Sequence, residues 1–290
     1  MASKGRLWQV DAHGFLMNDA HLDHIKPPFS DVVNDVAKAY LEHIGDEIHS
    51  IYVTGSVARG LAVEGQSDLD VIALLEYYTE PELVMQDWVA PTEETVIAKH
   101  DCVSDVQIEI WPHGWVLHDE SEFSISAFVL KTHAVCVWGA DITPDLTDYK
   151  FTERETRLAI ANDDIVQIEP DIDEALAEIE ADDSPVHVRY WCKRICKNMV
   201  HAAFGLVMVD EVVHTRDIDL SASYFIKHFP DYEPEMKQAM QWIESPIDDA
   251  QELMDFLDTF GAWLIAECDE WLDQHNPDRY LEYQFESDED

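Results

Sequence analysis

Two aspartates stand one residue apart at the start of an apolar segment. Asp68 and Asp70 alternate with Leu69 and Val71, and apolar residues continue to Leu75. Because strand side chains alternate between faces, both carboxylates project to one side while Leu69 and Val71 enter the core. Adjacent carboxylates repel each other unless cations lie between them, and Mg²⁺ prefers such hard oxygen ligands. The pattern predicts a magnesium site on a strand.

A glycine–serine turn precedes this pair. Residues 51–53 are suited to a strand, and Gly55 and Ser56 follow it. Glycine lets the backbone approach a phosphate closely, and the serine hydroxyl with neighbouring N–H groups can hold that phosphate. Arg59 and Ser67, between the turn and the aspartates, are further candidates for nucleotide contacts. A phosphate-binding turn beside a metal-binding carboxylate pair is the minimum that phosphoryl or nucleotidyl transfer requires.

The spacing of these residues resembles a known signature. Gly55-Ser56, eleven intervening residues and then Asp68-Leu69-Asp70 are similar to the motif of the nucleotidyltransferase superfamily that includes DNA polymerase beta. The resemblance implies an enzyme that uses Mg²⁺, with two ions, and ATP or another nucleoside triphosphate as donor. Such an enzyme attaches a nucleoside monophosphate to a hydroxyl and releases pyrophosphate. The alternative is a pair of solvated aspartates at a strand edge.

A third carboxylate is expected on the following strand. Residues 103–111 alternate apolar and polar positions, which predicts a strand whose polar face carries Glu109. In the superfamily a third acidic residue arrives on such a strand, and we choose Glu109 over Asp105, which lies nearer the strand's start. Glu109 can bind the metal or act as general base on the acceptor hydroxyl. The alternative is a charged residue on an exposed strand face.

Length, composition and cysteine usage limit the class of protein. With 290 residues, 47% of them apolar, the chain suits one large or two modest domains. Its apolar runs are too short to span a bilayer, and the first ten residues lack an apolar signal segment. The five cysteines lack zinc-type spacing. These features predict a cytoplasmic protein without a membrane partner.

The charge balance constrains the partners. Eighteen basic residues stand against 61 acidic ones, a formal net charge of −43. Such a surface repels polyanions, which disfavours extended nucleic acid as a partner. It favours a cationic or neutral acceptor, or it reflects adaptation to high salt, and the sequence does not separate these explanations.

The two halves differ in predicted secondary structure. In the first half, the pattern predicts a helix over 30–43, helical segments over 81–90 and 92–99, a helix over 121–131 and a strand over 134–138. In the second half, the pattern predicts long helices. Their expected starts are a Thr152–Glu155 capping box, Ser184-Pro185, and residues 217–219, 234 and 247. We therefore predict an α/β (α+β) nucleotidyltransferase domain with a small mixed sheet (1–148), then an all-α helical bundle (149–290) with an acidic tail (285–290).

A basic cluster stands out in the helical half. Arg189, Lys193 and Lys197 recur every four residues and share a helix face, with Arg194 adjacent. Arg216 precedes the next predicted helix. In so acidic a chain, this concentration predicts a bound anion, and a nucleoside triphosphate is the anion that the first half requires. The alternative is local pairing with acidic neighbours.

The order of the two halves resembles the two-domain aminoglycoside nucleotidyltransferases, particularly the streptomycin/spectinomycin adenylyltransferases. This resemblance implies that nucleotide and acceptor bind in the cleft between the domains, and that the acceptor is a small molecule resembling an aminoglycoside. The alternatives are a protein-modifying, antitoxin-like nucleotidyltransferase with a protein acceptor and an inactive acidic binding protein of the same fold. The acceptor, the base preference and the oligomeric state stay open.

Overall fold

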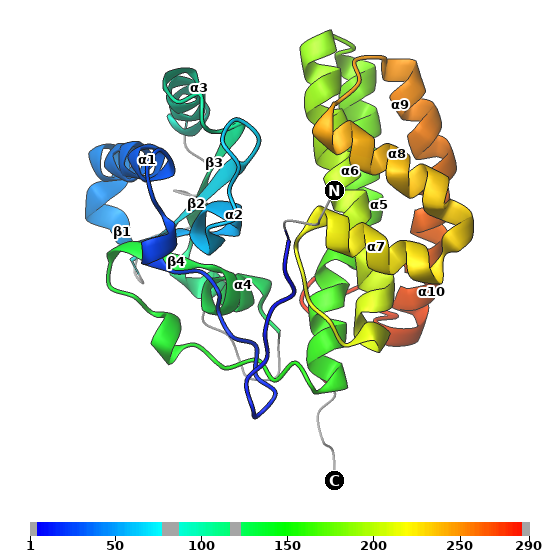
Figure 1. The fold of residues 1–290 in the computed structure, drawn as a ribbon, viewed down its shortest axis with the longest axis horizontal. Coiled ribbons are helices and arrows are strands. Elements are labelled where there is room, and N and C mark those ends of the chain that lie inside the picture. The colour runs from blue at the N-terminus through cyan, green and yellow to red at the C-terminus, as the bar shows by residue number, and fades with distance from the viewer. Residues whose placement is uncertain (1–4, 77–86, 117–122, 286–290) are drawn as a thin grey trace. The chain divides into compact units, whose positions relative to one another are not determined.

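The computed structural model describes residues 5–76, 87–116 and 123–285 (Figure 1). The chain forms two compact units: Gln9–Tyr149, and Lys150–Asp290 together with Met1–Trp8. The functional domain boundary predicted after residue 148 stays a prediction.

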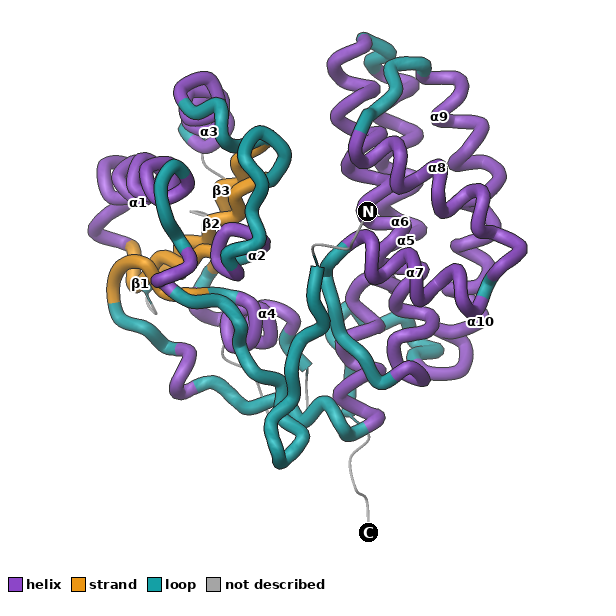
Figure 2. The backbone as a smooth tube through the Cα atoms, viewed as in Figure 1, coloured by secondary structure: helices purple, strands orange, loops and turns teal. Residues whose placement is uncertain are grey.

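The first unit contains the small mixed sheet that the sequence predicts. Its strands are β1 (Ile48–Val53), β2 (Asp68–Leu75), β3 (Asp105–Trp111) and β4 (Val135–Gly139). They lie in the order β3-β2-β1-β4, with β2 parallel to β3 and β1 antiparallel to both β2 and β4. Figure 2 draws the strands in orange. The strand carrying the aspartate pair is therefore internal, and the one carrying Glu109 is at the edge.

Helices cover both faces of this sheet. They are α1 (Phe29–Ile44), α2 (Gly55–Arg59), α3 (Val89–Lys99) and α4 (Ile125–His133). α1 and α3 pack on one face (Figure 1), where Leu69 and Val71 of β2 join Val106 and Ile108 of β3 in one apolar core. α4 packs on the other face, beside Ile72 at the far end of β2. The alternation predicted for β2 and β3 is confirmed.

Several predicted boundaries in this unit need correction. α1 begins at Phe29 rather than at Ser30. The helix expected from 121 begins at Ile125, because the Ser124 hydroxyl accepts a hydrogen bond from the Ala127 N–H at 3.0 Å and caps it there. The helical segment predicted over 81–90 falls largely outside the described residues.

The edge strand β3 carries a side-chain cap. Glu93 of α3 accepts a hydrogen bond from the Ile108 N–H at 2.8 Å. An edge strand has a row of backbone donors without a strand partner, and this carboxylate occupies one of them.

The second unit is mainly helical, as predicted. Its helices are α5 (Arg154–Ala181), α6 (Pro185–Glu211), α7 (Ile218–His228), α8 (Glu233–Glu244), α9 (Ala250–Phe256) and α10 (Ala262–His275). The start of α6 at Ser184-Pro185 is confirmed. The Thr152–Glu155 capping box is wrong, because α5 begins at Arg154 with Glu153 at its N-cap and no side-chain cap bond. The single helix predicted from 247 contains a π-helical turn, Leu257–Gly261, between α9 and α10.

Two class-level features follow from the described residues. Within 5–76, 87–116 and 123–285, no helix is both long and apolar enough to cross a membrane. All five cysteines are free thiols. Most of the predicted acidic tail, residues 286–290, lies outside the described residues.

Candidate active site

The acidic residues of β2 and β3 share one face of the sheet. In the parallel register Asp68 pairs with Asp105, and Glu109 pairs with Ile72, two residues beyond Asp70. Side chains at paired positions of parallel strands point to the same side, so all four carboxylates lie on the face opposite α1 and α3. Both third-carboxylate candidates therefore stay open: Asp105 beside Asp68, and Glu109 farther along the strand.

The glycine–serine turn meets the aspartate pair directly. Gly55 is the first residue of α2 and has φ +69°. A Cβ atom built on it would lie 2.7 Å from Oδ2 of Asp70. The Thr54 N–H also donates to the Asp70 carbonyl at 3.1 Å. Both the left-handed backbone and the lack of space call for glycine here, and the turn lies against the carboxylate as the motif spacing predicts.

The two serines of the motif differ in their contacts. The Ser67 hydroxyl accepts a hydrogen bond from the Val63 N–H at 2.9 Å and closes the loop before β2. The Ser56 hydroxyl is buried and has no hydrogen-bond partner among the described residues. A buried polar atom without a partner costs free energy, so Ser56 suits a group that receives or donates a hydrogen bond there.

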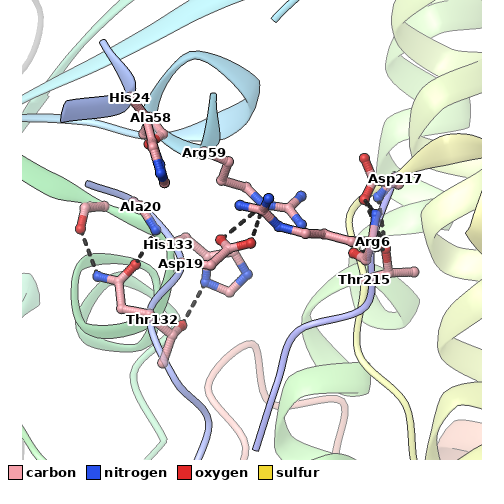
Figure 3. Close-up of polar contacts among 12 residues, drawn as sticks. Arg6, Asp19, Ala20, His24, Ala58, Arg59, Thr132, His133, Thr215 and Asp217 are labelled. Atoms are coloured by element: carbon pink, nitrogen blue, oxygen red, sulfur yellow. Dashed lines mark hydrogen bonds and ion pairs between the residues drawn. The ribbon is translucent and has the colours of Figure 1, made fainter. Parts of the chain in front are cut away.

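Arg59 has a structural partner in its own unit. Its side chain is 4% exposed, and its Nε–H donates to the Asp19 carboxylate at 2.9 and 3.1 Å (Figure 3). The neighbouring Ala58 carbonyl lies 3.2 Å from Nδ1 of His24. These contacts fasten the segment before α1 to the C-terminal end of α2. A nucleotide contact for Arg59 stays a prediction.

Glu109 is oriented by an indole. Nε1 of Trp111 donates to Oε2 of Glu109 at 2.8 Å. The side chain retains access to solvent, yet crowding by protein atoms desolvates the carboxyl and raises its pKa, while the Trp111 hydrogen bond acts in the opposite direction. The contact leaves Oε1 available, which is compatible with either role predicted for this residue.

The basic cluster lies on α6 of the helical unit and engages local acids. Arg189 forms an ion pair with Asp248. Arg194 donates to the Tyr190 hydroxyl at 3.1 Å and lies 3.9 Å from Glu174. The other two cationic residues of the predicted cluster on this helix are Lys193 and Lys197. Both arginines thus pair locally, neither lysine is free of interactions, and a triphosphate contact by this cluster stays a prediction.

Arg216 lies beside an acidic pocket in the same unit. Its guanidinium donates to the Asp164 carboxylate at 2.9 and 2.6 Å. Asp164 helps to line a pocket of about 220 Å³ with Asp163, Gln167, Asp171 and Asn198. Burial, and then the charge of Asp164, raise the pKa of Asp163 to about 7, whereas Arg216 acts to lower it. Burial also raises the pKa of Asp171. Burial is the main cause of both shifts, and Arg216 and Arg194 act in the opposite direction on Asp163 and Asp171.

The donors fit Mg²⁺ in type. Asp68 and Asp70 supply two carboxylates from one strand face beside the turn, and a metal-bound nucleotide would supply further oxygens. In the part of the chain that the structure describes, no group of three or more His, Cys, Asp or Glu side chains is placed to hold a metal by itself.

Comparison with known proteins agrees with this geometry. Residues 34–121 match the family model for the nucleotidyltransferase domain. The chain therefore contains a nucleotidyltransferase domain, the class of enzyme domain that the motif indicated.

The solved structures that match include spectinomycin adenyltransferase AAD(9) from Enterococcus faecialis with ATP and spectinomycin. It has 14% sequence identity and a TM-score of 0.44, and covers 82% of this chain and 98% of its own. A search of curated proteins found no match.

Sequence reasoning missed the residues that surround these groups. The pocket acids had a usable signal, since Asp164, Gln167 and Asp171 recur at helical spacing and so share a face. No sequence signal marks Glu93, which contacts Ile108, or Tyr40, whose hydroxyl contacts the backbone of β2 and β3. An acid or an aromatic residue on a predicted helix does not reveal which strand atoms it will contact.

Proposed function

We propose that the chain transfers a nucleoside monophosphate, AMP from ATP, to a hydroxyl acceptor with release of pyrophosphate, in an Mg²⁺-dependent reaction. The close approach of Gly55 to the Asp70 carboxylate, where a Cβ atom would lie 2.7 Å from Oδ2, carries this proposal. The candidate phosphate-binding turn and the candidate metal-binding strand therefore lie next to each other. Both segments fall within the residues that match the family model.

The residues have separate roles in this proposal. Asp68 and Asp70 hold the metal ions, which when bound neutralise charge on the triphosphate and the leaving pyrophosphate. The turn amides and the Ser56 hydroxyl orient the β- and γ-phosphates. Glu109 takes the acceptor proton or completes the metal site, with its carboxylate held by Trp111. The basic cluster of α6 and Arg216 is proposed to contact the triphosphate.

The acidic pocket supports a cationic acceptor. Three aspartates line it, Asp163, Asp164 and Asp171. The guanidinium of Arg216 pairs with Asp164, and the charge of Arg194 acts on Asp171. Burial first, and then the charge of Asp164, raise the pKa of Asp163, and an incoming ammonium would offset the second of these effects. We therefore propose an aminoglycoside-like small molecule, rich in both ammonium and hydroxyl groups, as the acceptor.

The test uses ATP labelled at the α-phosphate, Mg²⁺ and a panel of aminoglycosides. Labelled product together with pyrophosphate is expected, and chelation of Mg²⁺ with EDTA should stop both. Asp70→Asn should abolish turnover while the circular dichroism spectrum stays native, whereas Asp46→Asn, at an exposed aspartate of the same unit, should not. Near-normal transfer by Asp70→Asn would exclude the mechanism.

The same experiment separates the alternatives. Label on a protein instead of an aminoglycoside would establish the antitoxin-like, protein-modifying reaction. If calorimetry detects no Mg²⁺-dependent ATP binding, the chain is an inactive binding protein with this fold.

A further inference from the structure

Tyr40 of α1 reaches the backbone of both strands that carry the candidate acids. Its side chain is fully buried. The hydroxyl lies 2.8 Å from the Val71 carbonyl oxygen and 2.7 Å from the Glu109 carbonyl oxygen. A phenol has one proton to donate, so the two carbonyls share it or exchange it.

These two carbonyls belong to the site. Val71 follows Asp70 directly on β2. The second carbonyl is the backbone carbonyl of Glu109 itself, on β3. A single hydroxyl therefore ties the backbone beside one candidate metal ligand to the backbone of the candidate base. It does so from the face opposite the carboxylates, so Tyr40 itself does not compete with a substrate or a metal ion.

The surroundings fix Tyr40 as a rigid donor. Its ring packs edge-on against Trp88 with centroids 5.7 Å apart, and Trp88 stacks on His43 at 4.5 Å. Burial, and then the negative charge of Glu109, raise the pKa of the phenol well above its ordinary value. The hydroxyl thus keeps its proton at any pH of interest.

β3 needs such a tie because, among the strands that the structure describes, it lies at the edge of the sheet with β2 as its one neighbour. Along β3, Glu109 lies level with Ile72, two residues beyond Asp70. Its carboxylate can meet the aspartates only if the two strands keep their separation at this point. We propose that Tyr40 is a positioning residue that holds the Asp70 segment of β2 and Glu109 of β3 in the geometry required for nucleotidyl transfer. The inference rests on the proposed function.

Tyr40→Phe tests it, because this substitution keeps the ring and removes the hydroxyl. Tyr52→Phe is the matched control: Tyr52 is equally buried in the same sheet. Its hydroxyl accepts from the Ile142 N–H at 2.9 Å and donates to Oδ1 of Asp141 at 3.4 Å, and neither partner belongs to β2 or β3. We expect Tyr40→Phe to lower kcat about 10-fold, with KM for ATP within about twofold of wild type, because lost orientation acts on the transition state. Tyr52→Phe should leave kcat unchanged.

A second readout needs no turnover. Amide hydrogen exchange over residues 105–111 should be about fivefold faster in Tyr40→Phe than in Tyr52→Phe, since one buried hydrogen bond is lost at that strand. Equal exchange in the two variants, equal kcat, or a rise in KM without a fall in kcat would overturn the inference. A wild-type chain that transfers no nucleotide would refute the proposed function, and the exchange comparison would then decide the positioning role alone.

Discussion

Replacing Gly55 by alanine tests the contact on which the proposed chemistry depends. The new Cβ would lie 2.7 Å from Oδ2 of Asp70, whereas ordinary contacts begin at 3.4 Å, so a shift of about 0.7 Å between the two is needed to restore an ordinary contact, and the side-chain carboxylate is the group freest to make it. A displacement approaching 1 Å at a reacting centre can cost about 100-fold in rate. We therefore expect kcat to fall between about 10- and 100-fold.

The substitution also strains the backbone. Gly55 has φ +69°, and an L-residue in that region costs about 1–2 kcal/mol. Gly65→Ala is the matched control, because Gly65 has φ +71° in the same unit but its Cβ would meet only the Asp101 carbonyl at an ordinary 3.6 Å. The two variants should lose similar stability in thermal melts, while only Gly55→Ala loses activity.

The assay is pyrophosphate release with saturating ATP and Mg²⁺, at a temperature where both variants remain folded. If Gly55→Ala and Gly65→Ala have the same kcat within twofold, the turn does not position the Asp70 carboxylate for catalysis, and the reasoning fails.

Two further predictions concern stability. Arg59→Met removes a buried guanidinium that pairs with the Asp19 carboxylate, and breaking such a pair should lower the free energy of unfolding by about 3 kcal/mol, read from urea titration; a loss below about 1 kcal/mol would contradict a stabilising role for this pair. Because the folded pKa of Asp163 is raised to about 7 from 3.8, the folded state binds the extra proton and wild-type stability falls as pH rises from about 4 to about 7. Asp163→Asn should therefore gain stability over wild type across that window, whereas the exposed Asp173→Asn should not, and parallel pH profiles for wild type and Asp163→Asn would contradict the assignment.

The sequence was most informative where local chemistry decides the structure. The alternation of Leu69 and Val71 with the aspartates predicted both the strand and its two faces, because burial of the apolar side fixes the register. The Ser184-Pro185 helix start was predicted because proline at the first turn loses no hydrogen bond.

Tertiary contacts set the limits of that prediction. Thr152 was expected to cap α5, yet the helix begins at Arg154 without a side-chain cap bond. The partner of Arg59, Asp19, lies forty residues earlier in the chain, so no local pattern could reveal it. The choice between Asp105 and Glu109 likewise depends on the register of two strands about thirty residues apart in sequence, which alternation alone does not specify.

The Glu93 cap on β3 has a consequence for assembly. Because its carboxylate already occupies the Ile108 donor, a peptide or a second copy adding a strand at this border would have to expel a negatively charged group and supply an acceptor in its place. The Glu93 side chain of α3 thus disfavours pairing of another chain with the strand that bears Glu109.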